Sequence, residues 1–194
     1  MSDLTILALS GSLRKASLNT RLLTAAQNVA PPELSFDRFQ DLAAIPPFNE
    51  DEEHPAPAAV TDLRQRIHAA DGVLIATPEY NGSLPGVLKN ALDWLSRPSD
   101  FGDVLNRKPV AIIGASTSPI GTIRAQLNLR VVLHKMNAAV LGQPEFLLSL
   151  AHQHLTDSDA LPEQATAILS NVLNGLSDLI RHQHAVAALI AEAN

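Results

Sequence analysis

The 194-residue chain contains no cysteine. This absence excludes disulfide bonds, thiolate-bound zinc or iron–sulfur clusters, and dithiol redox chemistry. Any electron transfer by this protein therefore needs a bound cofactor. Aromatic residues make up only 4% of the chain, with one Trp and one Tyr, so stacking platforms for single-stranded nucleic acid are nearly absent. The net charge of -6 also argues against binding to a nucleic-acid backbone.

Long apolar runs are missing as well. No stretch reaches the roughly 18 residues of a membrane span, and the start Met1-Ser2-Asp3 has no basic region followed by an apolar run. We therefore expect a soluble, cytoplasmic protein without a membrane or nucleic-acid partner. Charged residues are scarce at 18%, whereas apolar residues reach 46%, so the chain can bury a sizeable core. The length suits a single domain over residues 1–194.

Short apolar runs alternate with stretches of helical periodicity, which predicts an α/β protein with a doubly wound, five-stranded parallel sheet in three α/β/α layers. Residues 43–57, rich in proline and acidic residues, predict a surface loop without regular structure. The C-terminal stretch is either one helix or two joined near Gly175. We expect strands at 4–10, 35–39, 72–77, 109–115 and 138–142, and helices at 18–29, 58–70, 85–95, 120–137 and 161–192.

The loop after the first strand, residues 11–19, leads into a helix N-terminus. Unpaired backbone N–H groups and the helix dipole make such a place attractive to anions. Ser12, Ser17 and Asn19 add neutral donors, and Arg14 adds a positive charge suited to a phosphate. The loop lacks the Gly-Lys-Ser/Thr ending of a P-loop. It is either a phosphate cradle or an ordinary turn that Ser17 caps, with a surface arginine.

Two further loops follow buried strands, and ligands in such sheets bind at the carboxyl ends of the strands. Residues 77–86 carry the only tyrosine, Tyr80, next to Asn81 in a segment bounded by prolines. This segment predicts either hydrogen bonding to the edge of a flat heterocycle or a plain turn with a surface aromatic. Residues 115–121 are small and polar, so a planar ligand can approach their backbone near Ser116.

Together the three loops resemble the NADPH-dependent FMN reductase family of flavodoxin-like proteins, which includes bacterial quinone and chromate reductases. The resemblance rests on residues 11–19 (GSLRKASLN) and on residues 78–81 (PEYN) followed by residues 85–97 (PGVLKNALDWLSR). In element order it extends from residue 4 to about residue 150. It implies a flavodoxin-like fold, an FMN cofactor and NADPH or NADH as electron donor. Quinones, chromate, azo dyes, ferric complexes and free flavin are the acceptors it allows.

The resemblance also implies roles for individual residues. The flavin N5 is the reactive centre, so no catalytic side chain is required. Arg124 is a candidate contact to an anionic acceptor or to the nicotinamide nucleotide, with an ion pair between subunits as the alternative. The FMN phosphate is expected at Ser12, Arg14, Ser17, Leu18 and Asn19, and the isoalloxazine ring at Pro78, Glu79, Tyr80, Asn81, Gly82 and Ser116.

Two positions depart from the family pattern. Thr122 replaces a second glycine that is common in the family, and Gly82 stands where several chromate-reducing relatives carry an aromatic residue. Family members form dimers or tetramers through helices that flank the flavin site, so a homodimer or homotetramer is expected. Trp94 is then either a core residue or part of a subunit contact.

Two other functions are compatible with this fold. The main alternative is a flavodoxin-type carrier of single electrons, which the modest net charge and the arginine in the phosphate loop disfavour. A flavin-free regulatory domain of the same fold is the second. The histidine pairs at residues 152 and 154 and at 182 and 184 do not predict a metal site, because residues two apart share a face only on a strand, and the second pair lies in a helical stretch.

Overall fold

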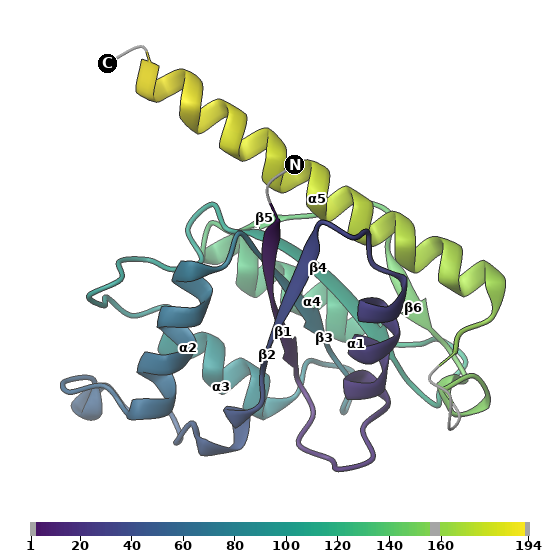
Figure 1. The fold of residues 1–194 in the computed structure, drawn as a ribbon. Helices are drawn as coiled ribbons and strands as arrows, with labels where there is room; N and C mark the ends of the chain where they lie inside the picture. Colours follow the sequence, from purple (N-terminus) through teal and green to yellow (C-terminus); the bar gives the residue numbers. More distant parts are fainter. Residues whose placement is uncertain (1–2, 156–159, 193–194) are drawn as a thin grey trace.

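A six-stranded parallel sheet forms the centre of the computed structural model, which describes residues 3–155 and 160–192 (Figure 1). The strand order is β2-β1-β3-β4-β5, and β6 also pairs with β4. This order is that of a flavodoxin-like doubly wound sheet, so the predicted fold class is confirmed. The strands are β1 (Leu4–Ser10), β2 (Leu34–Phe39), β3 (Gly72–Ala76), β4 (Pro109–Ala115), β5 (Ala139–Val140) and β6 (Phe146–Leu148).

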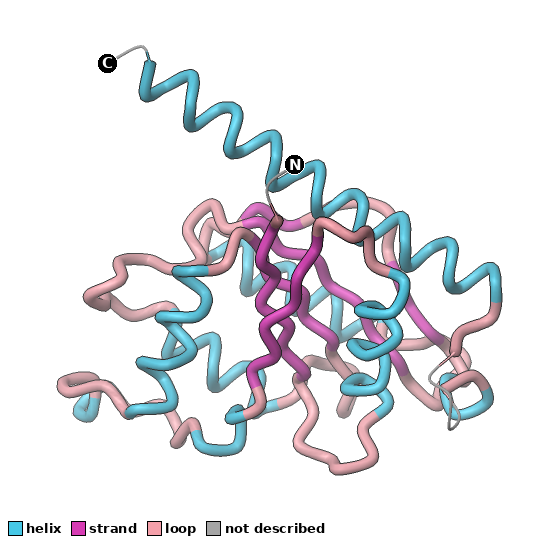
Figure 2. Tube along the Cα trace, viewed as in Figure 1, coloured by secondary structure: helices cyan, strands magenta, loops and turns pink. Residues whose placement is uncertain are grey.

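Helices cover both faces of the sheet and give three layers (Figure 2). Helices α1 and α5 pack on one face, and α2, α3 and α4 pack on the other. Both β3 and β4 are buried along their whole length, which explains why their sequences are almost continuously apolar. The helices are α1 (Leu18–Val29), α2 (Ala58–Ala69), α3 (Gly86–Leu95), α4 (Ile123–Lys135) and α5 (Glu163–Glu192).

The last predicted strand is wrong in its extent. One strand was expected at residues 138–142, but the chain forms two short strands, β5 and β6, which both pair with β4. Gly142 and Pro144 lie between them. The pairing of β5 ends at Val140, and the chain pairs with β4 again from Phe146, after the proline, which cannot donate to a strand ladder.

Smaller differences concern the ends of elements. Residues 43–57 were expected to lack regular structure, yet short 3-10 helices occupy Asp41–Ala44 and Glu50–Glu52. Helix α4 begins at Ile123 rather than at residue 120. The C-terminal stretch is a single helix without a break at Gly175, which packs against Leu141. Beyond the sheet, α5 projects freely in Figure 1.

Trp94 is a core residue and not part of a subunit contact, the two alternatives that its sequence left open. Its side chain is fully buried among the residues of α2, α3 and β3. The indole Nε1 donates a hydrogen bond of 2.8 Å to the Pro46 carbonyl, and the Phe48 ring meets the indole edge-on with centroids 5.1 Å apart. Trp94 thus ties the long connection after β2 to α3. Within the described residues, no helix is long and apolar enough to cross a membrane.

Candidate functional site

The three loops singled out in the sequence meet at the carboxyl edge of the sheet. Because β1, β3 and β4 are neighbouring parallel strands, the loops that follow them leave at the same edge. Between these loops lies a hollow of about 110 Å³. It is lined by Ser12, Arg14, Ser17, Leu18, Asn19, Pro78, Glu79, Tyr80, Ala115, Ser116 and Thr117.

Nine of the eleven residues expected around the cofactor line this hollow, whereas Asn81 and Gly82 do not. Ala115 and Thr117 were missed, although their place beside Ser116 at the end of a buried strand could have indicated them. Close packing brings the first two loops together. A Cβ atom on Gly11 would lie 3.0 Å from Leu88 Cδ2 and 3.5 Å from Pro78 Cδ, so the first loop packs closely against α3 and the start of the second loop.

The first loop ends in a capped helix, as the sequence predicts. Ser17 is 2% exposed, and its hydroxyl oxygen accepts a hydrogen bond of 3.2 Å from the Thr20 N–H. The Ser17 hydroxyl proton therefore stays available for a ligand oxygen. Leu18 and Asn19 begin α1, and the N–H groups of a first helical turn lack acceptors within the helix. These donors converge on one side of the hollow.

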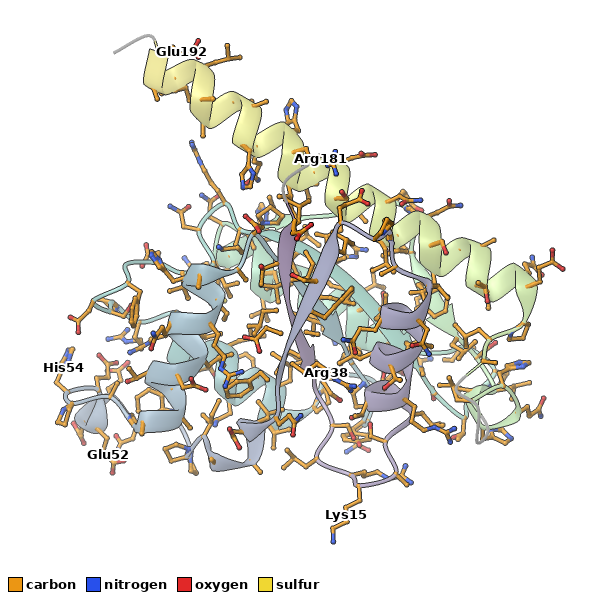
Figure 3. The ribbon with its side chains drawn as sticks, viewed as in Figure 1. Lys15, Arg38, Glu52, His54, Arg181 and Glu192 are labelled. Carbon is orange, nitrogen blue, oxygen red and sulfur yellow. The ribbon has the colours of Figure 1, made fainter. Side chains whose placement is uncertain are left out.

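Arg14 and Lys15 are adjacent cations with different surroundings. Both are exposed, but Arg14 lines the hollow, whereas Lys15 points away from the protein at the tip of the loop (Figure 3). Within the described part of the chain, no carboxylate lies within ion-pair distance of the Arg14 guanidinium. Its positive charge is thus free to meet an anion at the start of α1.

Asn19 joins the first loop to the third. Its amide Nδ2 donates to the Ala115 carbonyl at 2.9 Å, and its Oδ1 accepts from the Ala115 N–H at 2.9 Å. The side chain is 2% exposed, so water does not compete for these bonds. An amide nitrogen carries two N–H groups, and one is left for a ligand. Asn19 therefore fixes the spacing between the start of α1 and the end of β4.

The second loop contains a tight two-residue turn. The Tyr80 N–H donates to the Ser83 carbonyl at 3.0 Å, and the Ser83 N–H donates back to Tyr80 at 3.1 Å. Between them Asn81 has φ of 51° and Gly82 has φ of 72°. Positive φ at both central residues is typical of a type I′ turn, for which Asn-Gly is the preferred sequence. The turn presents the exposed Tyr80 ring beside the hollow.

Glu79 lines the hollow, but its carboxylate is directed to α4. Oε2 accepts hydrogen bonds from the Arg124 N–H at 2.9 Å and the Ala125 N–H at 3.1 Å. The other oxygen, Oε1, lies 3.6 Å from Arg124 Nη1, and the Glu79 side chain is only 10% exposed. If Glu79 contacts a cofactor, its main chain makes the contact, since both carboxylate oxygens face α4.

The third loop is held by β6. The Ser116 N–H donates to the Leu148 carbonyl at 3.0 Å, and the Ser116 Oγ accepts from the Ser118 N–H at 3.0 Å. Thr122, the departure from the family pattern, is fully buried directly over Gly114. A Cβ atom on Gly114 would lie 1.9 Å from Thr122 Oγ1, so the two positions depend on each other. Thr122 is part of the packing beneath the loop and does not line the hollow.

The donor set fits a phosphate monoester with a flat ring system attached. Three serine hydroxyls, one guanidinium and helix N-terminal N–H groups surround the hollow, and the one carboxylate among its described lining residues, that of Glu79, is bound to α4. A volume of about 110 Å³ suits a phosphate group, and the Tyr80 turn lies beside it, where a ring would extend over the surface. Fold and site thus define a flavodoxin-like protein with a hollow rich in hydrogen-bond donors at the carboxyl edge of its sheet.

Comparisons with known proteins name the family. Residues 4–153 match the model of the NADPH-dependent FMN reductase family. An NAD(P)H-dependent FMN reductase of Pseudomonas aeruginosa is 41% identical over 182 residues, which are 92% of this chain and 96% of the relative. A 2-hydroxy-1,4-benzoquinone reductase of Burkholderia sp. is 45% identical over 146 residues, 75% of this chain and 78% of the relative.

A solved structure has a similar fold and a related sequence. The flavoenzyme NAD(P)H:(acceptor) oxidoreductase FerB from Paracoccus denitrificans superimposes with a TM-score of 0.85 at 33% identity, over 92% of this chain and 98% of FerB. The chain belongs to the NADPH-dependent FMN reductase family. It is an oxidoreductase that uses FMN as cofactor and NAD(P)H as electron donor.

The Asn19 bridge generates a prediction on stability. Asn19→Ala removes two buried hydrogen bonds and leaves the Ala115 N–H and carbonyl without partners. We expect the free energy of unfolding of the FMN-free protein to fall by about 2–4 kcal/mol in urea denaturation. Asn128→Ala is the control, because Asn128 also makes two hydrogen bonds, to Gly82 and Ser83, but is exposed. Its expected loss is below about 1 kcal/mol, and equal losses in the two variants contradict the bridging role.

Proposed function

We propose that this enzyme transfers hydride from NADPH or NADH through FMN to small-molecule electron acceptors, with quinones as the principal class. The names of the Burkholderia and other relatives as quinone reductases support this choice of acceptor. Bound FMN supplies a ring that accepts hydride at N5 and passes two electrons on. Chromate, azo dyes, ferric complexes and free flavin are further candidate acceptors, because an exposed reduced ring is accessible to all of them.

The observation that carries this proposal is the hollow between the three loops. Ser12, Arg14 and Ser17 would bind the phosphate, since hydroxyl and guanidinium groups form short, charge-assisted hydrogen bonds to phosphate oxygens. Main-chain groups of residues 78–82 and the backbone near Ser116 would border the ring. No side chain of the site needs to act as an acid or base.

Arg124 is the proposed contact for a negatively charged substrate. Its side chain is 62% exposed and stands beside the Tyr80 turn, where a Cβ atom on Gly82 would lie 3.5 Å from Arg124 Cδ. The small Gly82 therefore leaves the arginine uncovered at the edge of the site. An anionic acceptor or the phosphates of the nicotinamide nucleotide are the groups it suits.

We also propose that residues 1–194 form one domain and that the enzyme works in the cytoplasm. Both helical layers pack on a single sheet, which supports the first statement. The supply of NADPH and NADH inside the cell supports the second.

The proposed reaction is tested by an anaerobic visible spectrum of the FMN-loaded protein. Addition of NADPH or NADH is expected to bleach the flavin absorption, and a benzoquinone added afterwards is expected to restore it with two electrons per FMN. Bleaching without recovery by the quinone contradicts the proposed acceptor class. Bound flavin that neither nucleotide reduces supports the single-electron carrier instead.

The phosphate contact is tested with a matched pair of cations. Arg14→Ala removes a charge-assisted hydrogen bond, so we expect the dissociation constant of FMN in a fluorescence titration to rise about tenfold or more. Lys15→Ala removes the same charge from the next residue, which points away from the hollow (Figure 3). Its expected effect is below about twofold in 0.15 M salt. Similar losses in both variants argue for a general charge effect and against a phosphate contact at Arg14.

We propose that the enzyme is a homodimer or homotetramer and that α4 contributes to the subunit contact. Ile123, Leu127 and Val131 are exposed large apolar residues at helical spacing on α4, and we call them the α4 stripe; the exposed Ile120 lies just before the helix. Val131 also borders a larger hollow of about 600 Å³ between α3 and α4. An apolar stripe continuous with a groove is typical of a protein–protein contact. A second copy of the chain is the proposed partner.

Leu127→Glu places a charge at the centre of the α4 stripe, and a buried unpaired charge is costly. We therefore expect the oligomer to dissociate in size-exclusion chromatography with light scattering. Val186→Glu is the control, because Val186 is an exposed apolar residue in the C-terminal half of α5, outside the stripe. A native protein that is monomeric, or a Leu127→Glu variant that keeps the native mass, argues against this contact.

A further inference from the structure

Helix α4 lacks a cap from its own residues. Thr122 precedes the helix but makes no capping hydrogen bond with its side chain. The Thr122 hydroxyl is instead buried and accepts a hydrogen bond of 3.1 Å from Gln126 Nε2. The N–H groups of the first turn therefore need an acceptor from elsewhere.

Glu79 supplies that acceptor from the second loop. Its Oε2 accepts from the N–H groups of Arg124 and Ala125, at 2.9 and 3.1 Å, which are the second and third residues of the helix. These are the two positions that a capping side chain normally satisfies. The cap thus comes from a residue more than forty positions earlier in the chain, and it lies in the loop that lines the hollow.

A second contact ties the same loop to α4. Asn128 Nδ2 lies 3.3 Å from the Gly82 carbonyl and 3.2 Å from Ser83 Oγ, so α4 contacts the loop on both sides of the Tyr80 turn. The ion pair between Glu79 and Arg124 is longer, at 3.6 Å, and the arginine is mostly exposed. Such a pair contributes little by itself, so the hydrogen bonds to the main chain carry the attachment.

We propose that Glu79 is a positioning residue for FMN: its carboxylate caps α4 and thereby fixes the main chain of residues 78–82 against the flavin site. This inference rests on the proposed placement of the flavin ring beside that loop. The Glu79 side chain itself does not touch the cofactor. The side chain contributes an acceptor oxygen at hydrogen-bond distance from the Arg124 and Ala125 N–H groups, and its negative charge is secondary.

Two conservative variants separate the effect of the length of the Glu79 side chain from the effect of its charge. Glu79→Gln keeps an acceptor oxygen at the same distance from the main chain and removes the charge. Glu79→Asp keeps the charge but is one methylene shorter, so the oxygen no longer reaches both N–H groups. We expect the FMN dissociation constant of the aspartate variant to rise about tenfold, the equivalent of a lost helix cap, and that of the glutamine variant to rise less than about threefold.

The absorption spectrum of bound FMN is the second readout, and we expect it to move toward that of free FMN in the aspartate variant only. Glu145→Gln is the control, because Glu145 also lies 3.6 Å from an arginine, Arg130. It is expected to bind FMN like the native protein. Arg124→Ala is expected to change the FMN dissociation constant by less than about twofold, since the main-chain donors remain.

The inference is overturned if the aspartate variant binds FMN normally, or if the glutamine variant loses as much affinity as the aspartate variant. Normal FMN binding by the aspartate variant shows that the cap does not affect the cofactor site. Equal losses of affinity in the two variants assign the effect to the negative charge. A native protein that fails to bind FMN at all refutes the proposed function itself, whereas normal native binding with indistinguishable variants refutes only the role of Glu79.

Discussion

The two hydrogen bonds between the Asn19 side chain and the main chain of Ala115 are the constraint on which the site depends. They connect residues 96 positions apart and lie in the buried junction between α1 and β4. The donors for a phosphate come from the start of α1, whereas the third loop begins at the end of β4. The Asn19 bridge therefore sets the spacing between these donors and the third loop.

The side of the site where the flavin ring is proposed to lie is organised differently. Here a loop is held by its own type I′ turn and by α4, through Glu79 at one end and Asn128 near the other. Helix α4 also carries the exposed α4 stripe and Arg124. One helix therefore connects the placement of the loop, the proposed contact to an anionic substrate and the proposed subunit contact. Displacement of α4 is expected to affect all three, since they share one rigid element.

Much of this arrangement could be predicted because the signals are local. Ser17 caps α1 since serine before an apolar periodic stretch is a strong capping pattern, and β3 and β4 follow from their unbroken apolar runs. The predicted last strand was too long, since β5 covers only Ala139–Val140, and β6 was missed because its three apolar residues are too few to show a period. Trp94 could not be assigned to core or interface, because its partner Pro46 lies in a distant loop.

The sequence by itself determined the alternation of strands and helices, the three loops with their donors, and the family to which they point. Spacing along the chain is enough for these, since they depend on neighbours within a few residues. Only the tertiary structure decided what Glu79 and Asn19 do. Both were expected at the cofactor, and the structure shows that their side chains hydrogen-bond to the main chain of other elements, while Asn19 keeps one N–H for a ligand. These partners come from segments far apart in the chain, and only packing brings such segments together.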